Sequence, residues 1–492
     1  MQLDEVLLET PSFRGCHRNS NSAAGSTMAS GNISEFYAAV CAEHEIKINP
    51  HVLQVLQETT VTESFTLKLT GKEHLRHVQR LDDKDIFALS KCLRNNQSVT
   101  GLDFRYNNIT NEGVGHLVDL LQKDTSALHS LDLMSNDIQT DGAEVLAKSL
   151  QCNSTLLSLS LSGNKIENRG AMHLASMLQV NNTLKHLELA DCDLATQSVI
   201  AFAIVLKSNK TLLSVDFSRP LLFSLQEEWA VHFSEMLAVN SSLVELHLGK
   251  MGMTDTGMER LTEGLRLNHS LRYLDLRGNR VTRDGVRHLV ELLKKNPTLE
   301  VIDLSSNRIE DEGAVCLSEA VAWPGCVLRE LSVCSNNIGT EGLLSLARVL
   351  TVNTTLNHIY IWGNHLEEPV CLAFRELIAS GRLPPDQTDV SAYEVDGRVF
   401  LSEVFHSLRK HYHSTNSSAT DTSTTSNTTT DPLTNHAAAS CASTFPHPLS
   451  RLSSASTFPH PPSRLSSAST FPHPPSRLSS SSLRRLAKKE PH

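Results

Sequence analysis

The sequence of 492 residues predicts an α/β solenoid, a horseshoe with parallel strands on its concave face and helices on its convex face. The phrase LRYLDLRGNRVTRDG at 271–285 returns as LEVIDLSSNRIEDEG at 299–313. Both reduce to L-x-x-L-x-L-x-x-N, followed by a glycine and a helical stretch. The asparagine returns after 28 residues from Asn279 to Asn307, and after 29 from Asn307 to Asn336. A fixed period of this length indicates that one structural unit is stacked many times.

Each unit is expected to contain one strand and one helix. The x-L-x-L-x core alternates with period two, which predicts a short strand whose leucines face inward. After the glycine, stretches such as GVRHLVELLKK at 285–295 space their apolar residues as a helix does. Strands pack about 4.8 Å apart whereas helices need about 8–10 Å, so the stack must curve with its strands inside.

The pattern is that of a leucine-rich repeat. Its asparagine is expected to satisfy backbone groups of the turn beneath each strand, because the amide both donates and accepts hydrogen bonds. It stands at Asn107, Asn136, Asn164, Asn279, Asn307, Asn336 and Asn364. Units at 184–194, 212–222 and 243–253 bring the number to ten, with Cys192, Pro220 and Met251 at the asparagine position. Pro220 and Met251 cannot donate, so we expect a local irregularity there, through sequence drift or as a hinge.

A second asparagine lies three residues before the first Leu or Val of seven units and creates an N-x-S/T sequon in each. These sequons stand at Asn96, Asn153, Asn181, Asn209, Asn240, Asn268 and Asn353. Because they recur with the period, we interpret them as products of the repeat. The first residues, MQLDEVLLET, lack the features of a signal peptide. No apolar run is long enough to span a bilayer. The ten cysteines include no C-x-x-C pair, as is typical of thiols that stay reduced. We expect a protein of the nucleus and cytoplasm without membrane contact, not a secreted one.

Five segments are expected along the chain. Residues 1–30 should be disordered, 31–95 a helical cap with an irregular lead-in unit, 96–383 the ten-unit array, 384–412 a hairpin and helix cap, and 413–492 a disordered Ser/Thr/Pro-rich tail. Within the cap, AYEVDGRVFL at 392–401 alternates around Asp396-Gly397. This pattern predicts a hairpin that closes the last strand edge.

The tail contains three 13-residue tandem copies, at 442–454, 455–467 and 468–480. FPHPP in the last two copies fits the F-P-x-φ-P ligand of EVH1 domains. The interpretation we favour is a drifting low-complexity tail. SLRRLAKKE at 482–490 is either a nuclear localisation signal or a solvated basic end.

Deleting residues 413–492 is expected to leave the melting temperature unchanged, because a segment that cannot bury apolar surface adds nothing to the stack. Calorimetry of the full and shortened chains measures this, and cellular localisation reads out any nuclear signal in SLRRLAKKE. A large fall in melting temperature on truncation contradicts the independence of the tail.

Charge and motifs narrow the function to protein binding. The net charge is -10, and residues 401–492 carry nine Lys/Arg against four Asp/Glu, or +5, which leaves -15 for residues 1–400. An acidic body repels phosphate, so no direct nucleic-acid binding by the repeats is expected. No phosphate loop, nucleophile elbow or metal-ligand cluster occurs, so we expect no catalytic residue, metal or cofactor. The leading class is a non-catalytic scaffold, and the alternative is a GTPase-activating module of the Ran-regulating leucine-rich repeat type.

The residue between the two strand leucines is expected to point into the hollow. We call these ten positions the concave row: Asp103, Asp132, Ser160, Glu188, Asp216, His247, Asp275, Asp303, Ser332 and Tyr360. Six are carboxylates and none is Lys or Arg, which suggests either an acidic surface for a basic partner or mere repeat consensus. If like charges repel there, Asp275→Asn should be neutral or stabilising.

Aromatic residues gather at the carboxy-terminal end of the hollow. Unit ten places His358, Tyr360 and Trp362 on strand positions expected to be exposed, and unit seven adds Tyr273 beside Asp275. Aromatics beside carboxylates are typical of a protein-binding hot spot. The competing interpretation is that Tyr360 and Trp362 pack under the 393–401 hairpin and seal the last unit.

The units with full helices at 96–380 resemble the ribonuclease-inhibitor class of leucine-rich repeats. Within this class, the chain resembles the leucine-rich repeat-containing protein 34 family over about 33–405. The segments that carry this resemblance are EFYAAVCAEHEIKINPHVLQVLQE, LDFRYNNITNEG and YEVDGRVFLSEV. This resemblance implies a nucleolar and cytoplasmic protein of stem and germ cells, linked to ribosome biogenesis and differentiation. It also implies nucleophosmin and nucleolin as partners.

Overall fold

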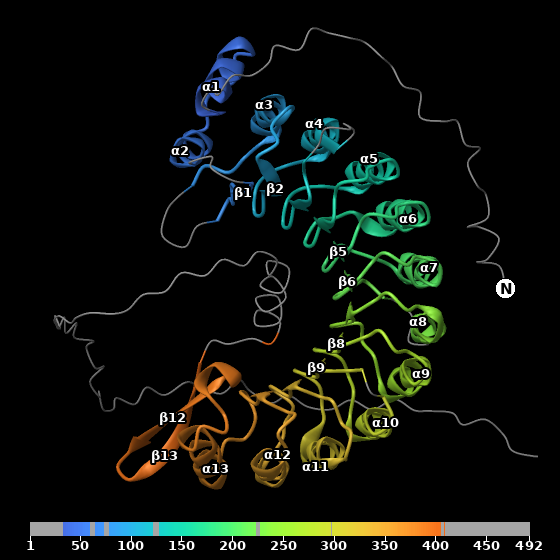
Figure 1. The fold of residues 1–492 in the computed structure, drawn as a ribbon, viewed down its shortest axis with the longest axis vertical. Coiled ribbons are helices and arrows are strands. Elements are labelled where there is room, and N and C mark those ends of the chain that lie inside the picture. Colours follow the sequence, from blue (N-terminus) through green and yellow to red (C-terminus); the bar gives the residue numbers. More distant parts are fainter. Residues whose placement is uncertain are drawn as a thin grey trace, which may run out of the picture. The chain divides into compact units, whose positions relative to one another are not determined.

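The computed structural model describes residues 33–59, 64–72, 78–121, 127–222, 227–296, 298–404 and 408. The segments expected to be disordered, the tandem copies and their EVH1 motif lie outside these residues. The described chain follows one arc, with strands on its inner side and helices on its outer side (Figure 1). The predicted solenoid is therefore confirmed.

Eleven short strands form one parallel sheet in strict sequence order. They are β1 (Phe65–Lys68), β2 (Val99–Asp103), β3 (Ser130–Asp132), β4 (Ser158–Ser160), β5 (His186–Glu188), β6 (Ser214–Asp216), β7 (Glu245–His247), β8 (Tyr273–Asp275), β9 (Val301–Asp303), β10 (Glu330–Ser332) and β11 (His358–Tyr360). Strand β1 belongs to the lead-in unit, and the strands from β2 to β11 belong to the ten repeats.

The helices of the array return on the convex side, each packed against the next. They are α3 (Asp83–Leu93), α4 (Asn111–Leu121), α5 (Thr140–Leu150), α6 (Glu167–Leu178), α7 (Thr196–Leu206), α8 (Glu228–Val239), α9 (Asp255–Leu265), α10 (Arg283–Leu293), α11 (Glu310–Ala322), α12 (Thr340–Val352) and α13 (Glu368–Ala379). Two further helices, α1 (Ile33–Glu43) and α2 (Pro50–Glu58), precede the lead-in unit.

Helix α10 shows how the sequence specifies these elements. Thr282 caps it by accepting a hydrogen bond from the backbone N–H of Asp284. The apolar residues of its inner stripe, such as Leu289, are buried. Gly285 is required because a Cβ there would lie 2.5 Å from Oδ1 of Asp255 in the preceding helix. The glycine of the repeat thus lets neighbouring helices approach closely.

Both asparagines of the repeat form ladders of hydrogen bonds. Asn136 donates through Nδ2 to Leu133 O at 2.9 Å and to Phe104 O of the preceding unit at 3.0 Å. Cys192 takes over one of these bonds, with Sγ 3.1 Å from Leu161 O. The second asparagine, in the sequons, reaches back in the same way: Asn181 Nδ2 donates to Leu150 O at 2.7 Å. The Asn181 side chain is 3% exposed, which agrees with the interpretation of the sequons as products of the repeat.

The irregularity expected near Pro220 leaves the sheet undisturbed. Strands β6 and β7 stay in register, with Asp216 opposite His247. The difference lies between β6 and α8, whose N-cap residue Glu227 takes a left-handed conformation with φ 50°. Leu221 N–H donates to Leu194 O at 2.7 Å and ties this loop to the preceding unit. The strand pairing is therefore continuous between units five and six.

The predicted hairpin is present, but its expected role is wrong. Strands β12 (Val390–Val395) and β13 (Arg398–Glu403) pair antiparallel as a separate two-stranded sheet. Asp396 and Gly397 join them with φ of 50° and 76°, as a type I′ turn requires. The edge of β11 is closed instead by the residues before the hairpin. Thr388 bridges to Ile359, and the Asp389 carboxylate accepts the N–H groups of Ile361 and Trp362 at 2.9 and 3.0 Å.

Candidate functional site

The concave row forms as a single line across the sheet. Each member pairs in register with the next, from Asp103 opposite Asp132 at one end to Ser332 opposite Tyr360 at the other. Because successive side chains of a strand point to opposite faces, the row lies on the side away from the leucine core. The repeat therefore presents one chosen side chain per strand at the same height.

Exposure along this face changes abruptly at β6. Strands β3, β4 and β5 keep partly exposed concave positions, and the side chain of Asp132 is 30% exposed. Every residue of β6 to β11 is buried, including Asp216 at 1% and Asp275 at 0%. The expectation that the whole row faces solvent is wrong for its carboxy-terminal part and also for Asp103 and Ser160, each 6% exposed.

Two arginines that the sequence reasoning missed offset the carboxylates. Arg105 lies 2.6 Å from Asp103 and 3.2 Å from Asp132. Arg277 lies 2.9 Å from the buried Asp275. Each arginine stands two residues after an aspartate, in the phrases LDFR and LDLR, and period two puts both side chains on one face. The sequence therefore contains the pattern that predicts these ion pairs, in the residue two positions after each aspartate of the concave row.

A buried group of charges surrounds His247. Its Nδ1 lies 3.3 Å from Asp275 Oδ2 and its Nε2 lies 3.7 Å from Glu245 Oε2. Burial by itself lowers the pKa of His247, but the hydrogen bonds to Asp275 and Glu245 outweigh it and raise the pKa from 6.5 to about 9. Burial, followed by repulsion from Asp275, raises the pKa of Asp303 to about 6. This stretch of the row is an ion-pair network and not an open acidic surface.

The carboxylates of β3 and β5, where the concave row is partly exposed, have different surroundings from those near His247. Burial raises the pKa of Asp132 to about 6, although the N–H of Met134 and the Arg105 guanidinium lower it. Glu188 is partly exposed and accepts a hydrogen bond from the Ser160 hydroxyl at 3.0 Å. Carboxylates that remain accessible to a partner are therefore concentrated on β3 and β5.

The aromatic residues expected to be exposed are not. Tyr360 is 1% exposed, Tyr273 0% and His358 7%. Tyr273, Val301 and Tyr360 form a small apolar cluster with Leu408, separate from the main core. Trp362 is half-buried and packs against the main core instead. In the competing interpretation, Tyr360 packs beneath the hairpin and seals the last unit. The structure shows a different packing, because the apolar partners of Tyr360 come from the sheet and from Leu408.

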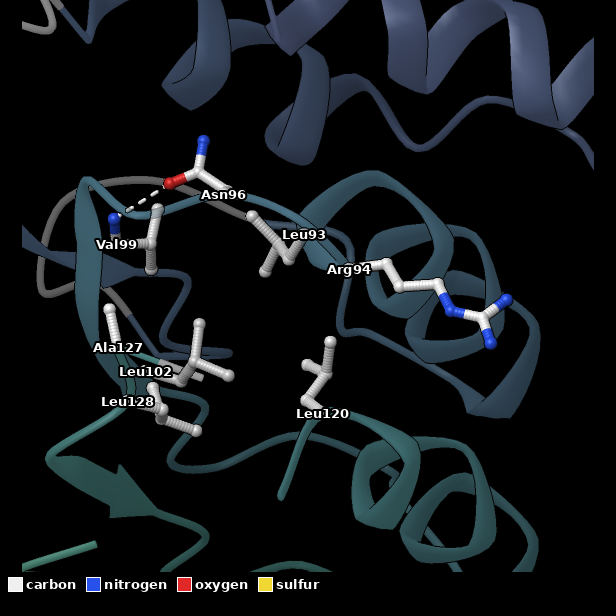
Figure 2. A pocket seen from close by; sticks show the side chains of 8 residues that line it. All are labelled: Leu93, Arg94, Asn96, Val99, Leu102, Leu120, Ala127 and Leu128. Atoms are coloured by element: carbon white, nitrogen blue, oxygen red, sulfur yellow. Dashed lines mark hydrogen bonds between the residues drawn. The ribbon is translucent and has the colours of Figure 1, made fainter. Parts of the chain in front are cut away.

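A second candidate lies at the amino-terminal end of the array. Figure 2 shows a pocket between the ends of α3 and α4, lined by leucines together with Val99 and Ala127, with Arg94 pointing away. It encloses about 20 Å³, which is room for one water molecule. The one dashed bond is the Asn96 cap to the Val99 N–H at 2.8 Å. This is a packing gap of the first repeat and not a ligand site.

Within the described residues, no group of three His, Cys, Asp or Glu side chains is arranged to hold a metal ion. Nor does any helix in the described part of the chain have the length and apolar character to cross a membrane.

Comparison with known proteins agrees with the repeat pattern. The Leucine Rich repeat family model matches residues 95–117, 127–147, 152–175, 180–203, 267–290, 295–318 and 326–347. Leucine-rich repeat-containing protein 34 of Homo sapiens is 47% identical over 391 residues, which cover 78% of this chain and 84% of that protein. The Mus musculus protein of the same name is 46% identical over 383 residues, covering 77% and 92%.

Among solved structures, an internalin from Listeria monocytogenes aligns with a TM-score of 0.39 and 17% identity, over 75% of this chain and 99% of that one. A likeness at this level carries no argument about function.

Proposed function

This chain belongs to the leucine-rich repeat-containing protein 34 family, and from that premise we propose that it is a non-catalytic scaffold that binds proteins through its concave face. The observation that carries the proposal is the concave row, which holds one side chain per strand in continuous register. Such a face offers many aligned contacts to a partner and needs no cofactor.

The open part of the face favours a partner with basic segments. Asp132 and Glu188 are its partly exposed carboxylates, and Arg105, which Asp103 holds at 2.6 Å, offsets Asp132 only in part from 3.2 Å. Lysine or arginine side chains of a partner would complement them and fix its position on the strands. Family membership supports the further proposals that the partners include nucleophosmin and nucleolin, in nucleolus and cytoplasm, and that the protein acts in ribosome biogenesis and in stem-cell or germ-cell differentiation.

Neutralising the open carboxylates is expected to weaken partner binding. With the tagged full chain, Asp132→Asn/Glu188→Gln should retain roughly five- to tenfold less nucleophosmin and nucleolin from cell extract at low salt, equivalent to about 1 kcal/mol for such charges. High salt should reduce this difference, because it screens exposed charges. Quantitative immunoblotting of the captured proteins is the measurement.

The matched control is Glu259→Gln/Glu263→Gln, which removes the same two charges from the exposed side of α9. It should retain partners as the unaltered chain does. Equal loss in both double variants indicates a nonspecific charge effect, and no loss in either removes the concave face from the proposal. A parallel Ran GTP-turnover assay tests the GTPase-activating alternative, for which repeat length is the supporting observation.

A further inference from the structure

The apolar cluster on the concave face is built like a binding socket. Its walls are Tyr273 of β8, Val301 of β9 and Tyr360 of β11, which we call the tyrosine socket, and Cys334 packs against its edge. These side chains lie on the face opposite the leucines, so the fold does not need them to fill its core. Large aromatic surfaces in a concave face are what partner-binding hot spots use.

The occupant of the socket is Leu408, which is 3% exposed. It follows the carboxy-terminal cap and stands four residues after Val404. The Val404 N–H donates to Asp389 O at 2.8 Å, and the Asp389 carboxylate is held by the backbone of β11's unit and by Cys334 Sγ at 3.1 Å. The chain is thus anchored beside the socket. So short a tether gives Leu408 an effective concentration in the range of about millimolar.

One polar group in the socket shows that the fit is incomplete. The Tyr360 hydroxyl is buried and has no hydrogen-bond partner among the described residues. A buried hydroxyl without a partner carries a desolvation cost. A ligand that brought an acceptor would remove that cost, so the present occupant is replaceable by one that fits better.

The sequence of the occupant also has a chemistry that suits the site. Leu408 is followed by Arg409 and Lys410. Strands β8, β9 and β10 of this part of the face carry Asp275, Asp303 and Glu330, so the charges nearest the socket are carboxylates, whereas the sequence after Leu408 is basic. This is the charge pattern already inferred for external partners.

We propose that the tyrosine socket is a binding site for a leucine side chain within a basic segment, and that Leu408 occupies it as an internal competitor of such partners. The proposal rests on the proposed function, since it assigns the buried part of the concave face to the same role as the open part. Partner binding at β8 to β11 then requires release of Leu408.

The test uses the full chain and a fluorescent peptide of residues 402–412, SEVFHSLRKHY. Leu408→Asp should empty the socket and bind this peptide at least about tenfold more tightly than the unaltered chain, in which the tethered leucine competes. A peptide with aspartate in place of the leucine should bind neither protein. The matched control is Leu372→Asp on α13, 40% exposed, which should behave as the unaltered chain. Fluorescence anisotropy gives the dissociation constants, and equal binding to all three proteins overturns the proposal.

Cysteine alkylation gives an independent readout of the open socket. Burial raises the pKa of the Cys334 thiol, so it should react slowly with iodoacetamide in the closed chain. In Leu408→Asp its labelling rate should rise several-fold, while Cys192, buried in the main core, stays protected. If Cys192 also becomes reactive, Leu408 is part of the fold and not a replaceable occupant, and the proposal fails.

The two proposals fail separately. If the peptide binds Leu408→Asp but extract capture shows no partner dependent on the concave face, the socket stands and the scaffold function falls. If capture depends on Asp132 and Glu188 but Leu408→Asp gains no peptide affinity, the scaffold stands and internal competition falls.

Discussion

Leu274→Ala is expected to lower the free energy of unfolding by about 2–5 kcal/mol. Leu274 is fully buried at the centre of β8, between Leu246 and Ile302 of the neighbouring strands. Its loss removes apolar burial and leaves a cavity that the regular stack cannot close, because each strand is fixed in register on both sides. Urea denaturation followed by circular dichroism is the measurement.

The matched control is Leu267→Ala, whose side chain is 63% exposed just after α9. Its effect should stay within about 0.5 kcal/mol, as for other surface substitutions. Equal destabilisation by the two alanines would mean that the strand phase assigned to unit seven is wrong.

Asp275→Asn is expected to destabilise the protein by about 3 kcal/mol, the lower end of the range for breaking a buried ion pair. Asp275 is fully buried and meets both His247 and Arg277. The asparagine can still accept the Arg277 N–H, but it leaves two cations without their counter-charge. The loss is limited because Arg277 keeps a third of its side chain exposed and His247 can release its proton. The sequence alone predicted a neutral or stabilising change, since it showed only the like-charged row.

The pH dependence of stability distinguishes this explanation from a simple packing defect. A histidine whose folded-state pKa is raised stabilises the fold fully below its unfolded pKa, and that contribution is lost as pH rises through the folded pKa. For His247 the window runs from 6.5 to about 9. The unaltered chain should therefore lose stability across this window, and Asp275→Asn should lose less. Parallel curves for the two proteins would contradict the assigned pairing.

Asp191→Asn is the matched control, because it breaks an exposed pair with Arg219 at 3.1 Å. An exposed pair contributes about 0–1 kcal/mol, so this variant should remain close to the unaltered chain in stability and in pH dependence.

The repeat architecture could be read from the sequence because its determinants are local and periodic. The spacing of Leu274, Asn279 and Gly285 specifies a strand, a turn and a helix within one unit, and the next unit repeats the same contacts. The hairpin at Asp396-Gly397 was equally local, since two adjacent residues define its turn. Even the Arg277 pairing lay within two residues of its aspartate.

The state of the concave face was decided only by tertiary structure. Tyr360 is buried in one cluster with Tyr273, 87 residues earlier in the chain, and with Leu408, 48 residues later. Asp389 closes the edge of β11 through backbone N–H groups that no side-chain pattern reveals. Periodicity determines contacts between neighbouring units, whereas contacts that a cap or a following segment makes across several units depend on where the chain leaves the stack. The sequence therefore determined the horseshoe and the row across it, and the tertiary structure determined which part of that row a partner can reach.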